Sequence, residues 1–267
     1  MIKLKPEWLI LLWFGGLAWG QESLTWAVND APPFHIYEGP YAGKGFCDLL
    51  IQDLRQRMPE YQHEVRRVPQ ARITKLRQQG APVCFPCMIK KPDTDTTLYS
   101  DATNSYKPHQ IITNPENYQK LADKYGEPIS LEALLQDAVF TFGYPLGRKY
   151  GERLQPLIEQ HSLPREDHLA LTAGEVTRSV LRLVQVGRLD YNIDYRAVGR
   201  YFELLEQQPL RYLPIAENQD REIIGAVGCS NTGWGRRVIK DINRVLPELE
   251  SDSAYRQSLR FWFGSAS

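Results

Sequence analysis

Two cysteines separated by two residues, Cys84 and Cys87, have a spacing that is typical of three kinds of site. Cys-x-x-Cys occurs in redox-active dithiols and as half of a zinc site, and it also arises when two structural cysteines lie close together. A redox dithiol needs its first cysteine at the start of a helix, where the helix dipole lowers the pKa of the thiol. Cys84 lies instead in the apolar run "VCFP", which predicts a strand. The other two cysteines, Cys47 and Cys229, are distant in sequence, so no further zinc ligands are close by.

The first twenty residues predict a secretory signal peptide. Lys3 and Lys5 form a short basic head, residues 8–17 are apolar and uncharged, and small residues precede Gln21. Because this run is shorter than the about 20 residues that a membrane-spanning helix needs, we expect cleavage near Gln21 and export to the periplasm, with an uncleaved anchor as the alternative. In that oxidising compartment four cysteines favour two disulfide bonds, for which three complete pairings are open.

The charge balance and the missing motifs argue against several classes of function. The chain carries 32 basic and 32 acidic side chains, whereas a nucleic-acid-binding protein usually has a basic excess. Its histidines show no His-x3-His spacing, and it has no glycine-rich phosphate-binding loop. We therefore expect no metal, no cofactor and no nucleic-acid partner. A Ser-His-Asp triad stays open, because triads assemble from positions that are distant in sequence.

Strand-like and helical patterns alternate along the chain after the signal peptide. The order from residue 24 to residue 86 is strand, helix, strand, helix, strand, which predicts a parallel sheet with helices packed on it. After His109 the alternation continues with a different spacing and predicts a second, smaller unit. The chain then returns through the apolar run "REIIGAVGC" and closes with two helices. The predicted fold class is therefore α/β.

Several strings occur in the order found in family three of the exported solute-binding proteins, the amino-acid-binding type. They are "PPF" after the first predicted strand, "GKGFCDLL" at the first helix, "CMIKKPDTDTTLYSDATNSY" after the third strand, "VGRLDYNIDY" in the second unit and "YRQSLRFWFG" at the end. The last string is the most specific, because it repeats the closing Tyr-x6-Trp-Phe-Gly of that family. The chain resembles the family over nearly its whole length after residue 20. Through Ala71-Arg72, Cys84 and Gly147-Arg148-x-Tyr-Gly it also resembles a less characterised branch of it.

This resemblance implies a two-lobed type 2 periplasmic-binding fold with a ligand cleft between the lobes. Lobe one would comprise residues 21–108 and 225–267, and lobe two residues 109–224, after a signal peptide at 1–20. The resemblance also places the "GAVGC" strand beside the third strand, which makes Cys84–Cys229 the expected disulfide, with Cys47–Cys87 as the second pairing. Such a protein would act as a monomer.

Both ends of the clamp that holds an amino acid in this family are altered. The arginine that grips the ligand carboxylate is replaced by Thr94, and the position of the aspartate that binds the ligand ammonium falls on Tyr195, one residue after Asp194. Arg148 is the most attractive substitute for the arginine, since it follows Gly147 at a predicted helix start, where free backbone N–H groups favour an anion. The other candidates for this grip are Arg72, Lys90 and Lys91.

The residues that we expect at the cleft come from both lobes. Each of three residues has an alternative to a place in the cleft. Phe34 would belong to the core, His35 would be a solvated loop residue, and Arg148 would lie on the surface at the start of a helix. The expected ligand-binding residues are Phe34, His35, Arg72, Met88, Arg148, Asp194 and Tyr195.

The sequence thus predicts a periplasmic solute-binding protein that closes two lobes on a small polar or anionic solute, amino-acid-like or an organic acid. It would serve transport or sensing, docked on a membrane transporter or a sensor, and it would not be an enzyme. Two alternatives stay open. A dehydratase-like enzyme on the same fold would need a carboxylate in the cleft as acid or base, and a ligand-free sensor-accessory protein would have a filled cleft.

Overall fold

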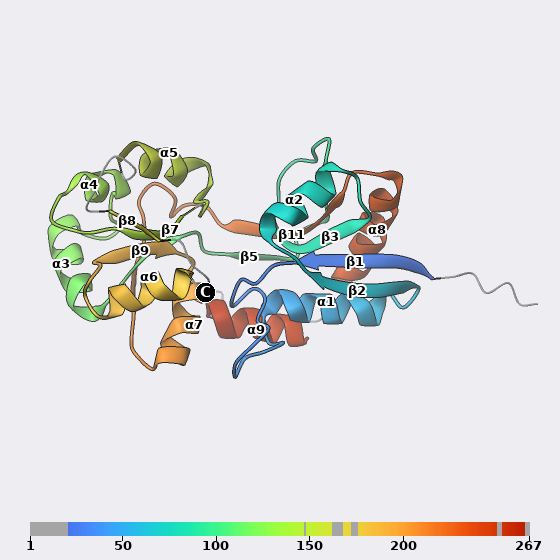
Figure 1. Ribbon diagram of the computed structural model, residues 1–267, viewed down its shortest axis with the longest axis horizontal. Coiled ribbons are helices and arrows are strands. Elements are labelled where there is room, and N and C mark those ends of the chain that lie inside the picture. Colours follow the sequence, from blue (N-terminus) through green and yellow to red (C-terminus); the bar gives the residue numbers. More distant parts are fainter. Residues whose placement is uncertain (1–20, 147, 162–167, 172–175, 250–252, 265–267) are drawn as a thin grey trace, which may run out of the picture.

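The computed structural model of the protein describes residues 21–146, 148–161, 168–171, 176–249 and 253–264. The described chain forms two lobes of mixed strands and helices, which lie side by side in Figure 1. This arrangement confirms the predicted α/β class and the two-lobed fold. The predicted signal peptide falls outside the described residues. None of the described helices has the length and apolar character needed to cross a membrane.

The sheet of lobe one combines strands from both ends of the described chain. Its members are β1 (Glu22–Val28), β2 (Tyr61–Arg67), β3 (Val83–Ile89), β4 (Thr97–Tyr99), β5 (Asn104–Tyr106) and β11 (Ile223–Ser230). The strand order is β2-β1-β3-β11-β4, and β5 also pairs with β11. β1 runs parallel to β2 and β3, as predicted, whereas the returning strand β11 runs antiparallel to β3.

Helices from both ends of the chain pack on this sheet. They are α1 (Phe46–Arg57), α2 (Gln70–Gln78), α8 (Gly233–Val245), the 3-10 turn η1 (Leu246–Glu248) and α9 (Ala254–Phe263). The core forms around Trp26 of β1, which is fully buried because both faces of its strand are covered. Trp262 of α9 is also buried, and its indole N–H donates to the carbonyl of Lys44 at 3.1 Å. The closing Tyr-x6-Trp-Phe-Gly string therefore fixes the last helix to lobe one.

Lobe two has a smaller sheet of its own. β6 (Gln110–Thr113) lies between β10 (Arg211–Leu213) and β9 (Tyr191–Asp194), both antiparallel to it, while β7 (Gly143–Pro145) and β8 (Leu169–Leu171) form a parallel pair. The helices are α3 (Pro115–Tyr125), α4 (Leu131–Gln136), α5 (Gly151–His161), α6 (Val176–Gln185) and α7 (Arg196–Glu206). Helix α7 also reaches lobe one, since Tyr201 lies 5.7 Å from Trp262 between ring centroids.

Two segments connect the lobes. The chain passes from β5 to β6 on its way into lobe two and from β10 to β11 on its way back (Figure 1). The side chain of Asn218 donates from Nδ2 to the carbonyl of His109 at 3.0 Å, which joins the two connections to one another. The expected boundary at 108/109 falls in the first connection, whereas that at 224/225 falls within β11, and the lobe boundaries stay predictions.

Both predicted disulfides are present. Cys84 of β3 is bonded to Cys229 of β11, with the two Cα atoms 4.0 Å apart, and Cys47 of α1 is bonded to Cys87 of β3. Cys84 and Cys229 form a directly opposed pair of adjacent strands and are fully buried. Because Cys84 and Cys87 have different partners, the Cys-x-x-Cys spacing is neither a redox dithiol nor part of a zinc site. It marks a strand that is tied on one side to β11 and on the other to the start of α1.

Candidate ligand site between the lobes

Aromatic side chains fill the place where the two lobes meet. Phe34, which follows β1 in lobe one, faces Tyr195, which precedes α7 in lobe two, with 5.8 Å between ring centroids. His109 stacks on the Tyr195 ring at 4.0 Å, and Tyr106 meets the same ring edge-on at 5.4 Å. We call these four residues the aromatic cluster. Its members come from both lobes and from the connection between them, so any movement of the lobes changes its contacts.

Arg148 and Asp194 form an ion pair beside the aromatic cluster. Asp194 ends β9 and is completely buried, whereas the Arg148 side chain is 27% exposed. Arg148 Nη2 and the backbone N–H of Tyr195 both donate to Asp194 Oδ1. Burial raises the pKa of the Asp194 carboxyl, and Arg148 and the Tyr195 amide oppose that rise. The arginine expected to grip a ligand anion thus already holds a carboxylate.

The backbone around Arg148 differs from the prediction. Helix α5 begins at Gly151, so Arg148 precedes the helix instead of starting it, and Gly147 falls outside the described residues. The Arg148 N–H donates to the carbonyl of Pro145 at 3.1 Å, in a turn that follows β7. Its amide is therefore occupied, and an anion at this position would depend on the guanidinium alone.

Several buried polar atoms at this place have no hydrogen-bond partner among the described residues. Three of them are Nε2 of His109, the hydroxyl of Tyr150 and Oδ2 of Asp194, and Oε1 of Gln110, which pairs with Asp194 across β6 and β9, is another. The three residues are neighbours, since the rings of His109 and Tyr150 lie 5.7 Å apart and the charge of Asp194 acts on Tyr150. A buried polar group without a partner costs about 1–3 kcal/mol, and native proteins satisfy nearly all such groups with protein, water or ligand atoms. This group of atoms is therefore suited to a polar solute.

The two titratable rings that stack in the cluster are uncharged at neutral pH. Burial, and then the charge of Arg148, lower the pKa of His109 to about 3. Burial raises the pKa of Tyr195 to about 12, although Arg148 acts in the opposite direction. The ion pair is consequently the main charge in this part of the site.

His109 gives a test by pH. A histidine in an unfolded chain has a pKa of about 6.5, whereas folded His109 stays neutral down to about 3. Its contribution to stability is thus present above pH 6.5 and is lost as the pH falls, and the loss is about 1.4 kcal/mol at pH 5.5. The free energy of unfolding, measured with urea, should fall in wild type between pH 7.5 and pH 5.5. In His109→Gln the fall should be smaller by about 1.4 kcal/mol. An equal drop in both proteins would contradict the assignment.

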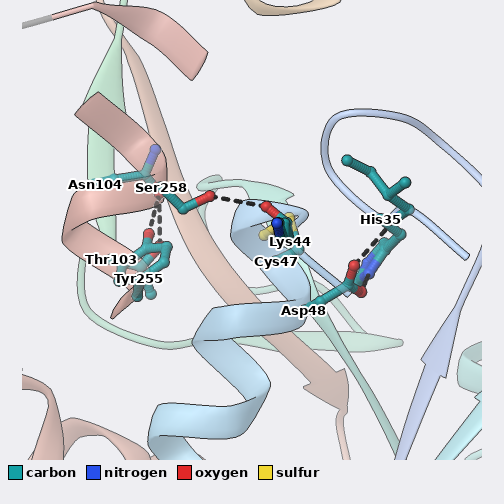
Figure 2. The surroundings of a disulfide bond; sticks show 10 residues. His35, Lys44, Cys47, Asp48, Thr103, Asn104, Tyr255 and Ser258 are labelled. Atoms are coloured by element: carbon teal, nitrogen blue, oxygen red, sulfur yellow. Dashed lines mark hydrogen bonds and ion pairs between the residues drawn. A yellow bond between two sulfur atoms is a disulfide. The ribbon is translucent and has the colours of Figure 1, made fainter. Parts of the chain in front are cut away.

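His35 is buried, and so is not the solvated loop residue of the alternative interpretation. Its Nδ1 lies 2.6 Å from Oδ1 of Asp48, whose Oδ2 accepts the backbone N–H of Ile36 at 2.9 Å (Figure 2). Asp48 lies in the first turn of α1, next to the Cys47–Cys87 disulfide. His35 therefore helps to hold the loop that carries Phe34, and its ring contacts are with residues of lobe one.

The structure does not bring Arg72 and Met88 to the aromatic cluster. Arg72 is exposed on α2, and the sulfur of Met88 instead contacts Nη1 of Arg77 at 3.2 Å. Lys90 donates from Nζ to the carbonyl of Ser100 at 2.9 Å, so this alternative cation is also engaged within lobe one. Of the seven predicted residues, Phe34, Arg148, Asp194 and Tyr195 lie together, and His35 adjoins them.

The expected ligand-binding residues did not include His109, Tyr150 or Tyr106. His109 and Tyr106 flank the connection between the lobes, and Tyr150 lies in the Gly-Arg-x-Tyr-Gly string. The string therefore could have pointed to Tyr150 as a site residue, whereas no motif in the sequence pointed to His109.

Two hollows of the described surface lie away from the aromatic cluster. One of about 650 Å³ lies between α6 and α7 and includes Arg182, Val186 and Glu206 in its lining. Another of about 370 Å³ lies between α1 and α9 and includes Tyr41 and Phe261. Neither is lined by a predicted site residue. The aromatic cluster occupies the space between the lobes, which is the feature expected of the ligand-free alternative, whereas the buried polar atoms without partners are the feature expected of a solute site. Within the described residues, His, Cys, Asp and Glu side chains form no group of three that could hold a metal ion.

Comparison with known proteins defines the fold. No protein-family model matches the chain, and no curated protein matches it. Among solved structures it is similar to the probable amino-acid ABC transporter extracellular-binding protein ytmK from Bacillus subtilis, with 14% identity, a TM-score of 0.67, and 92% of this chain and 98% of that chain covered. It is similar to an ancestral arginine-binding protein bound to arginine, with 16% identity, a TM-score of 0.63 and coverage of 91% and 99%.

A third similar structure is the ancestral amino acid-binding protein AncCDT-1, a precursor of cyclohexadienyl dehydratase, with 18% identity, a TM-score of 0.63, and 91% of this chain and 96% of that chain covered. At such identities the likeness shows the fold alone. The chain has the two-lobed fold of the amino-acid-binding proteins of ABC transporters, as the resemblance in its sequence implied.

Proposed function

We propose that this protein is an exported solute-binding protein that closes its two lobes on one small polar or anionic solute, amino-acid-like or an organic acid, for transport or sensing. The observation that carries the proposal is the group of three buried polar atoms of His109, Tyr150 and Asp194, which lack partners in the described part of the chain and lie where the lobes meet. The similar structures, which include amino-acid-binding proteins of ABC transporters, support it.

The mechanism is a closure about the two connections between the lobes. Opening separates Phe34 from Tyr195 and exposes the aromatic cluster and the ion pair to water. A solute that gives the unpartnered atoms their hydrogen bonds stabilises the closed form more than the open form, and it therefore shifts the equilibrium toward closure. The closed form would then be the one that docks on a transporter or a sensor.

A dehydratase-like enzyme is the second candidate function. A similar structure is a precursor of cyclohexadienyl dehydratase, and Asp194 is a buried carboxylate with a raised pKa at the meeting of the lobes, as an acid catalyst would need. Arg148 and the Tyr195 amide, however, both donate to Oδ1 and so favour the ionised form. This arrangement suits binding better than proton donation.

A thermal-shift screen of amino acids, organic acids, short peptides and sugars tests the proposal. A ligand at 100 times its Kd stabilises the folded state by about 2.7 kcal/mol, which raises the Tm of a chain of this size by about 5–10 °C. We expect at least one compound to do so with wild type and with Val139→Ala, a control on the surface of lobe two where Val139 is 69% exposed. Tyr195→Ala should lose the shift. A screen without any stabilising compound would contradict the proposed function.

A further inference from the structure

The candidate site contains a cation and an anion that already neutralise each other. The Arg148 guanidinium donates to the Asp194 carboxylate, and both belong to lobe two. The charge of Arg148 also acts on Tyr106, His109 and Tyr195, so the pair adjoins the aromatic cluster on the side where the lobes meet. A solute that enters between the lobes therefore meets a pair with no net charge.

Neither Thr94 nor Lys90 of lobe one supplies a compensating cation to this place. Thr94 stands where the similar family has its arginine, and its hydroxyl accepts the backbone N–H of Thr97 at 3.1 Å within its own loop. Lys90 is held by Ser100 and lies 3.7 Å from Asp101. Across the described residues, no ion pair or cation–π contact joins a cation of lobe one to the aromatic cluster.

Asp194 also determines which hydrogen bond the solute must make. Oδ1 accepts from Arg148 and from the Tyr195 amide, while Oδ2 is buried and lacks a partner within the described chain. A carboxylate oxygen can only accept. An anion that approached Arg148 would bring its own negative charge close to Oδ2, where the low local dielectric strengthens the repulsion. A donor on the solute would instead satisfy this atom.

We propose, on the basis of the function proposed above, that Asp194 sets the charge selectivity of the site. The solute carries no net charge, as a zwitterion or an uncharged polar molecule, donates a hydrogen bond to Asp194 Oδ2, and lays a flat or apolar face against Tyr195 and Phe34. Net anions, such as organic acids without a compensating ammonium group, are rejected. Asp194 thus narrows the range of solutes from polar or anionic to net neutral.

Matched pairs of probes test this selectivity. Glutamine and glutamate, and likewise asparagine and aspartate, have nearly the same shape but differ by one negative charge. Dissociation constants for the four probes should be measured by calorimetry with wild type, with Asp194→Asn and with Asp123→Asn. Asp123 is an exposed carboxylate on α3, so its replacement makes the same change in net charge away from the site.

In wild type we expect the neutral member of a pair to bind more tightly than the anionic member. Asp194→Asn frees Arg148 for a ligand carboxylate, so the preference should move toward the anionic member by about tenfold or more, whereas Asp123→Asn should leave it unchanged. The double variant Arg148→Gln/Asp194→Asn again has no net charge at the site and should return to the preference of wild type. The proposal would also be supported if Asp194→Asn bound glutamate or aspartate and wild type did not.

Several outcomes would overturn it. Tighter binding of glutamate than of glutamine by wild type would do so without any variant, and therefore even if Asp194→Asn failed to fold. An unchanged preference in Asp194→Asn would remove the role of Asp194 while leaving the proposed function intact. Failure of Asp194→Asn to bind either anionic probe would also overturn it, because an unpaired arginine would then be present without effect. The wider thermal-shift screen decides the proposed function separately.

Discussion

Removal of the Cys84–Cys229 disulfide is expected to lower the free energy of unfolding by about 5 kcal/mol. The bond closes a loop with a sequence separation of 145 residues, and in the chain-entropy description a longer loop restricts the unfolded chain more. Proteins of this kind are stable by only about 5–15 kcal/mol, so the double variant Cys84→Ala/Cys229→Ala should be barely folded at 37 °C. Equilibrium unfolding in urea at 15 °C measures the difference.

The second disulfide supplies the matched control. Cys47–Cys87 has a sequence separation of 40 residues, for which the same description gives about 4 kcal/mol. We expect Cys47→Ala/Cys87→Ala to be the milder of the two double variants, with its main effect on the loop that carries His35. A larger loss from this bond than from Cys84–Cys229 would contradict the prediction. Non-reducing peptide mapping that joined Cys84 to Cys87 would revive the redox interpretation.

Replacement of Arg148 by alanine should cost about 3–5 kcal/mol at pH 7, because it leaves the buried Asp194 carboxylate without its cation. Without Arg148 the pKa of Asp194 rises further above that of the unfolded chain, so the folded protein takes up a proton more readily than the unfolded one. The cost relative to wild type is therefore greatest at pH 7 and shrinks as the pH falls toward 5. Urea unfolding of both proteins at the two pH values measures it.

A double-mutant cycle separates this effect from lost packing. Arg148→Ala/Asp194→Asn leaves no charge at this site, so it should be more stable at pH 7 than Arg148→Ala. The part of the cost of Arg148→Ala that depends on pH between 7 and 5 should disappear in the double variant. If Arg148→Ala were as stable as wild type at pH 7, the pair would not be buried in solution as the structure has it.

The sequence predicted those parts of the fold that follow from the order of strands and helices along the chain and from the spacing of apolar residues within them. Alternating strand and helix patterns predicted the parallel pairing of β1, β2 and β3, since that pattern leaves few other topologies. The resemblance then placed β11 beside β3, which was enough to predict the Cys84–Cys229 pairing. In each case the information lies in segments whose order along the chain determines their neighbours in space.

The details of the site were harder to predict because its contacts join positions that are far apart in sequence. Arg148 and Asp194 are 46 residues apart, and nothing local marks them as partners. Their pairing changes the role expected for Arg148, from a free grip for an anion to half of a neutral pair. His35 is held in its buried position by Asp48, which lies 13 residues later in the sequence, on α1. Such contacts follow from tertiary packing, which residue spacing alone does not specify.

The most direct test of ligand binding between the lobes is a crystal structure of the protein with the compound that gives the largest thermal shift. We predict electron density for one molecule between the lobes, packed against Tyr195 and donating a hydrogen bond to Oδ2 of Asp194. Density for the compound in the hollow between α1 and α9 or in that between α6 and α7, with the aromatic cluster still closed on itself, would contradict a ligand site between the lobes.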